Sequence, residues 1–203
     1  MRTVAPLMNP ATRLAAATAL ALALTGCAPQ TKIKPKHAKV LTKARTIAVL
    51  PFQDAPGAKG SGKVVVSAIM AQLYDLPDMQ VVERARLAAI LKEKDLRGSV
   101  GSSRASAIGK LAGADLVIFG DIQQYEAQQD SGFVAVYVVS GGGTKHTHRV
   151  GLFVRAVSVA TGRVIYAAGG QGQDKVGYMK AARTAAAEAL RDLRAFYMQT
   201  RKE

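Results

Sequence analysis

A glycine-rich segment holds the most recognisable arrangement of reactive residue types in the chain. Gly57, Gly62 and Lys63 have the spacing G-x-x-x-x-G-K of a phosphate-binding loop, in which backbone N–H groups and the lysine hold the phosphates of a nucleotide. The next residue is Val64, whereas such a loop needs a serine or threonine there to bind Mg²⁺. Because this ligand is missing, we expect no bound nucleotide and no cofactor.

Two histidines form the second arrangement that could do chemistry. His146 and His148 are two residues apart, so on a strand both would face the same side and could bind a metal ion. A metal site needs a third ligand, and the nearest acid, Asp130, lies in the preceding loop. The third histidine, His37, lies in a basic segment, and no nucleophile–base arrangement stands out. The sequence therefore predicts exposed histidines, no metal site and no enzyme.

The N-terminus of the chain is typical of a secretory signal peptide. Arg2 and Arg13 supply a positive region, and residues 14–24 form an apolar run that is too short to span a bilayer well. This pattern predicts that residues 1–26 are a signal peptide. The net charge of +14 would favour nucleic acid as the partner of a cytosolic protein. Because the chain is predicted to be exported, we expect no nucleic-acid partner.

The single cysteine of the chain lies directly after this segment. Leu24, Thr25, Gly26 and Cys27 resemble the lipobox of bacterial lipoproteins, in which an apolar residue and two small residues precede a lipidated cysteine. The resemblance implies that signal peptidase recognises Leu24, Thr25 and Gly26 and that lipid is attached at Cys27. Three acyl chains would anchor the protein stably. By the sorting rule of such lipoproteins, Ala28 implies the periplasmic face of the outer membrane.

The segment after the cysteine is strongly basic. Residues 27–45 carry six lysines and arginines, no acid and two prolines, which predicts an extended and solvated tether. Such a tether would be attracted to anionic lipid headgroups or to cell-wall polymer. A solvated spacer without a target is the other interpretation.

Residues 46–203 are predicted to fold as an α/β domain with a mixed β-sheet flanked by helices, because helices and strands alternate first and antiparallel strands follow. The densest β-forming region breaks at Gly141–Gly143, which predicts the turn of an extended β-hairpin. The expected strands are 46–52, 79–82, 116–125, the hairpin arms 133–140 and 148–160, and 163–168. The expected helices are 63–75, 84–94, 104–112 and a long C-terminal helix over 175–201.

Four segments in this order carry a family resemblance: IAVLPFQD, VVERARLAAILKE, IGKLAGADLVIFGDI and VRAVSVATGRV. Their order and spacing after a lipobox resemble the lipoproteins of the curli secretion channel, the CsgG family. The resemblance spans residues 47–170. Its most specific parts are Glu83-Arg84, residues 114–122 and residues 154–164, which include Thr161-Gly162.

This resemblance implies an acylated homo-oligomer in the outer membrane. In that family each protomer gives two β-hairpins to a shared barrel, a loop after the first strand narrows the pore, and unfolded amyloid subunits are exported with accessory proteins. The first hairpin has a counterpart in residues 133–156. The second has none, because Tyr166 leads through Gly169 and Gly170 almost directly to the last helix.

Two functions remain open from the sequence. The first is an oligomeric outer-membrane lipoprotein that assists export or assembly of a secreted or surface product, with envelope proteins as partners. The second is a periplasmic accessory lipoprotein without a pore, similar to the activators of penicillin-binding proteins.

Overall fold

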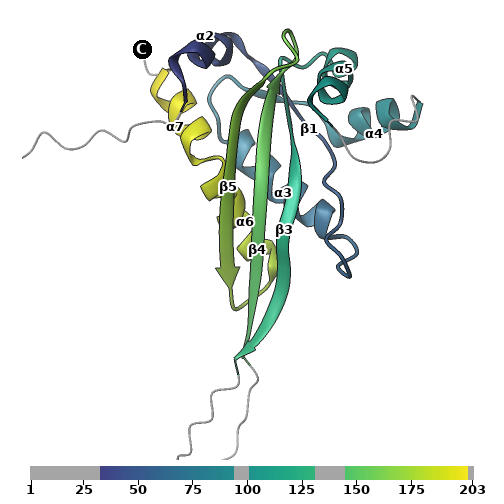
Figure 1. Ribbon diagram of the computed structural model, residues 1–203, viewed down its shortest axis with the longest axis vertical. Helices are drawn as coiled ribbons and strands as arrows, with labels where there is room; N and C mark the ends of the chain where they lie inside the picture. Colours follow the sequence, from purple (N-terminus) through teal and green to yellow (C-terminus); the bar gives the residue numbers. More distant parts are fainter. Residues whose placement is uncertain (1–32, 94–100, 131–144, 201–203) are drawn as a thin grey trace, which may run out of the picture. The chain divides into compact units, whose positions relative to one another are not determined.

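The computed structural model describes residues 33–93, 101–130 and 145–200, in which six helices pack around one five-stranded sheet (Figure 1). The predicted α/β class with a mixed sheet is confirmed. The strand order is β2-β1-β3-β4-β5, with β1 parallel to β2 and β3 and the other pairs antiparallel. The strands are β1 (Thr46–Val49), β2 (Gln80–Val81), β3 (Leu116–Asp130), β4 (Lys145–Ser158) and β5 (Val164–Asp174). The helices are α2 (Pro35–Lys43), α3 (Ser61–Tyr74), α4 (Arg84–Glu93), α5 (Ser102–Ala112), α6 (Tyr178–Ala189) and α7 (Arg191–Thr200).

Both faces of β1 are buried, which explains its unbroken apolar sequence. Successive side chains of a strand point to opposite faces of the sheet. Ile47 and Val49 therefore join one apolar cluster with residues of α3 and α6. Ala48 and Leu50 join a second cluster with residues of α4 and α5 on the other face.

The close packing of α6 on β5 depends on two glycines of the strand. A Cβ atom on Gly170 would lie 2.1 Å from the carbonyl oxygen of Ala185, and one on Gly172 would lie 2.0 Å from that of Ala181. No side chain fits between the two backbones at these positions. The helix meets the strand with a fully buried face of small residues: Ala181, Ala182, Ala185, Ala186 and Ala189.

The predicted C-terminal helix is present and is interrupted once. Leu190, with φ −101° and ψ 2°, separates α6 from α7. The apolar side continues across the break, because Leu190 and Leu193 are both fully buried. Three residues separate the end of β5 at Asp174 from the start of α6 at Tyr178.

A long antiparallel pair of β3 and β4 is present, and β3 extends beyond the predicted end at Tyr125. β4 pairs with β3 from Leu116↔Ser158 to Asp130↔Lys145, whereas the predicted arm at 133–140 lies outside the described residues. The polar run after Tyr125 contains residue types that are poor in strands, so the sequence suggested an end there. Ladder pairing with β4 carries the strand on to Asp130.

The prediction of an extended, solvated tether is wrong for residues 35–43, which form α2. Pro35 stands in the first turn, where its missing N–H costs nothing. Leu41 is fully buried, and its carbonyl oxygen accepts a hydrogen bond from the hydroxyl of Tyr197 (3.1 Å). The tether was predicted from the many lysines of this segment. The segment instead packs as a helix because Val40, Leu41 and Ala44 contact the apolar core.

Candidate functional site

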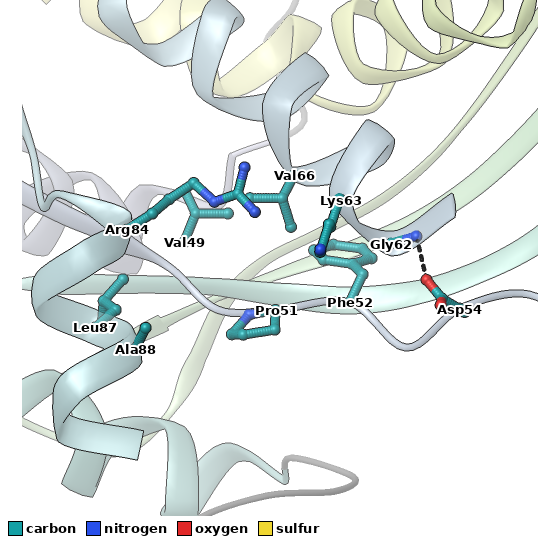
Figure 2. Close-up of a pocket in the computed structure, with 10 residues that line it drawn as sticks. All are labelled: Val49, Pro51, Phe52, Asp54, Gly62, Lys63, Val66, Arg84, Leu87 and Ala88. Atoms are coloured by element: carbon teal, nitrogen blue, oxygen red, sulfur yellow. Dashed lines mark hydrogen bonds between the residues drawn. The ribbon is translucent and has the colours of Figure 1, made fainter. Parts of the chain in front are cut away.

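A pocket of about 330 Å³ lies at the carboxyl end of β1 (Figure 2). Ligands of open α/β sheets bind in such positions, outside the carboxyl ends of strands. Three segments that are separate in the sequence build it: the loop after β1, the first turns of α3, and the start of α4. Apolar side chains form most of its wall, among them Val49, Phe52, Val66 and Leu87.

Asp54 occupies the helix N-terminus beside this pocket. Its carboxylate accepts hydrogen bonds from the backbone N–H groups of Gly60 and Gly62, both at 2.8 Å. These bonds lower the pKa of Asp54, and the positive charge of Lys63 acts in the same direction. In a phosphate-binding loop a phosphate would take this position. The glycine-rich loop thus presents its N–H groups to a carboxylate of its own chain.

Two cations, Lys63 and Arg84, line the pocket. Figure 2 shows the Arg84 guanidinium extending from α4 toward α3. Arg84 donates a long hydrogen bond of 3.4 Å to the hydroxyl of Ser67. The described lining residues thus offer an apolar surface beside positive charge. The sequence singled out Gly62, Lys63 and Arg84, which line the pocket, but it did not predict the pocket itself, because the walls come from separate segments.

The two strand histidines differ in their surroundings. His146 is exposed, whereas His148 is half-buried and meets the ring of Tyr178 edge-on at 4.5 Å. Tyr178 in turn stacks on Tyr125 at 4.1 Å, which joins the start of α6 to the hairpin. Exposure is thus confirmed for His146 and wrong for His148. Over residues 33–93, 101–130 and 145–200, no three His, Cys, Asp or Glu side chains are grouped to hold a metal ion.

The residues predicted for lipid attachment and peptidase recognition, Leu24, Thr25, Gly26 and Cys27, lie outside the described residues. Their roles stay predictions. Among the described helices, none combines the length and the apolar character needed to cross a bilayer.

The family described as "Curli production assembly/transport component CsgG" matches residues 30–189, which include α2 and all five strands of the sheet. The chain belongs to the CsgG family. The resemblance that the sequence motifs indicated is thereby confirmed. Among solved structures, this CsgG-family chain is similar to a dodecamer of a single-residue variant of PelC from Paraburkholderia phytofirmans, with 16% identity and a TM-score of 0.52 over 75% of this chain and 89% of that one.

A second structure is the LpoB C-terminal domain from Escherichia coli, with 18% identity and a TM-score of 0.43 over 68% of this chain and 92% of that one. The likeness to PelC shows that the CsgG-family chain shares its fold. A search of curated protein sequences finds no match.

Proposed function

We propose that the protein is a lipoprotein on the periplasmic face of the outer membrane, anchored through Cys27, that forms a homo-oligomer and assists export or assembly of a secreted or surface product. Its role is non-catalytic and involves other envelope proteins. The observation that carries the proposal is the CsgG-family match over residues 30–189, which begins three residues after the lipobox cysteine. The fold shared with PelC, which is a dodecamer, supports the homo-oligomer.

A monomeric accessory lipoprotein is the second candidate, and the junction of β5 and α6 favours it. In the family pattern a second membrane hairpin follows the last strand of the sheet. Here three residues lead from Asp174 to Tyr178. These three residues leave no room for a hairpin at this junction, so the oligomer that we propose does not depend on a second one there.

The mass of the full acylated chain in detergent separates the two candidates. Protein purified from membranes should run as a multiple of the protomer in light scattering, after subtraction of the detergent. A protomer-sized particle over the whole concentration range would favour the accessory lipoprotein. Intact mass spectrometry of the same sample reports the acyl chains on Cys27, so that a failure of the anchor is distinguished from a failure to oligomerise.

A further inference from the structure

The lysines of α2 lie on one side of the helix, and the core holds the opposite side. Lys36, Lys39 and Lys43 are all exposed. At about 100° per residue, their spacing places them within an arc of about 60°. Leu41, on the opposite side, is fully buried in the main apolar cluster. The three charges are therefore held in a fixed direction relative to the sheet.

A fourth lysine extends this group onto α5. Lys39 and Lys43 line a surface hollow of about 510 Å³ together with Lys110. Part of its wall is apolar, from Val40, Ala44 and Val159. We call Lys36, Lys39, Lys43 and Lys110 the basic face. In the part of the chain that the structure describes, none of the four forms an ion pair.

The acid in this hollow is engaged by the backbone. One carboxylate oxygen of Asp115 accepts the N–H groups of Arg45 and Thr46, at 2.8 and 3.0 Å. The lysine charges also act on a histidine of the same helix. Burial, followed by the charges of Lys36 and Lys34, lowers the pKa of His37.

The predicted lipid anchor brings this face close to a bilayer. Seven residues separate Cys27 from Pro35, the first residue of α2, so eight Cα–Cα steps join the two. Even fully extended, they span at most about 27 Å. Of the described elements, α2 is the first after the anchor. Its lysines carry compact positive charges, which bind phosphate groups.

We propose that the basic face binds the phosphate headgroups of anionic phospholipids in the membrane that holds the Cys27 lipid, with a headgroup phosphate in the hollow between Lys39, Lys43 and Lys110. The anchor itself belongs to the function proposed above, on which this site rests. The contact also orients the domain. Ser158, at one end of β4, lines the hollow. Lys145, at the other end of β4, pairs with Asp130 of β3 at the hairpin end of the sheet. The hairpin end of the sheet then points away from this membrane (Figure 1).

Lysine footprinting on vesicles tests the contact. The full acylated chain is reconstituted into phosphatidylcholine vesicles with and without phosphatidylglycerol, and acetylation of each lysine is read by mass spectrometry. The basic face should react several-fold more slowly in the anionic vesicles only. Lys175 and Lys180 follow the end of β5 that pairs with the hairpin end of β4. These two lysines should react equally in both vesicle types. About 0.5 M salt, where the Debye length is roughly 4 Å, should remove the protection.

Two further arms keep the test decisive. The Cys27→Ala chain, mixed with the same anionic vesicles at low salt, should show the same pattern more weakly, whether or not Cys27 normally carries lipid. A chain with Lys39→Gln, Lys43→Gln and Lys110→Gln should lose it, while the Lys175→Gln, Lys180→Gln chain keeps it. Equal reactivity of the basic face in both vesicle types would overturn the proposal. The proposal would also be overturned if inorganic phosphate without vesicles protected these lysines as fully as the anionic vesicles do.

Discussion

Replacing Gly172 by alanine tests how α6 is seated on the sheet. The added Cβ would lie 2.0 Å from the carbonyl oxygen of Ala181 and 2.7 Å from the N atom of Ala185. Both atoms belong to the backbone of α6, so no rotamer change relieves the contact. Ordinary van der Waals separation begins near 3.4 Å, so β5 and α6 must separate by about 1.4 Å.

The cost follows from what lies between the two elements. Overpacking of a close-packed interior typically costs about 1–3 kcal/mol. A separation of this size also opens gaps beside the buried alanine face of α6, so we expect about 3 kcal/mol, the upper end of that range. For a domain of this length it corresponds to a fall in Tm of about 6–12 °C.

Gly169→Ala is the matched control on the same strand. The nearest atoms to its new Cβ would be a backbone oxygen of Leu152 at 3.5 Å and a ring carbon of Phe153 at 4.0 Å, which are ordinary contacts. An alanine that fits without strain stabilises by about 0.4–1 kcal/mol, because the unfolded chain loses freedom. The two substitutions, three positions apart, should therefore change stability in opposite directions.

Urea unfolding followed by circular dichroism measures both effects. The variants and the wild type are compared at equal protomer concentration, since association would shift the transition. A lower midpoint at unchanged slope for Gly172→Ala is the expected result. A midpoint equal to that of Gly169→Ala would refute the close approach of the two backbones.

Three other outcomes are expected. Leu41→Ala should lower the free energy of unfolding by about 2–5 kcal/mol, as for a buried leucine, although it lies in a segment that the sequence suggested was a tether; a change below about 0.5 kcal/mol in urea unfolding would contradict the burial of α2. Burial, followed by the charge of Asp192, raises the pKa of Tyr166 to about 12. The stability that the neutral phenol contributes is therefore complete below about pH 10 and is lost as pH rises toward 12. Tyr166→Phe should remove this dependence of the free energy of unfolding on pH, and an equal slope against pH in both proteins would argue against it. Cys27→Ala should leave unprocessed or soluble protein in cell fractionation, and fully acylated outer-membrane material from that variant would disprove lipid attachment at Cys27.

The sequence predicted those strands and helices whose own apolar spacing and turn residues define them. The run from Ile47 to Leu50 is apolar at every position, and the structure covers both faces of that strand. Period and turn residues likewise placed α4 and α5 within two residues of their observed bounds. The family resemblance rested on the order of these same segments.

Tertiary pairing decided the rest. The polar residues from Glu126 to Gln129 have no strand pattern of their own, and β4 supplies the ladder that makes them a strand. Leu41 lies among lysines in the sequence, so its burial could not be predicted locally. It depends on α7, where the hydroxyl of Tyr197, 156 positions later, donates a hydrogen bond to the Leu41 carbonyl oxygen. The pocket at the carboxyl end of β1 unites side chains as distant as Val49 and Leu87, which no local spacing connects.

The mass of the acylated particle tests the central claim most directly. Full-length protein is extracted from membranes in mild detergent, its acylation is verified by intact mass, and its protein mass is measured by light scattering over a range of concentrations. We expect a stable multiple of the protomer that carries lipid on Cys27. An acylated protein that stays a protomer at every concentration would contradict a homo-oligomeric export or assembly component.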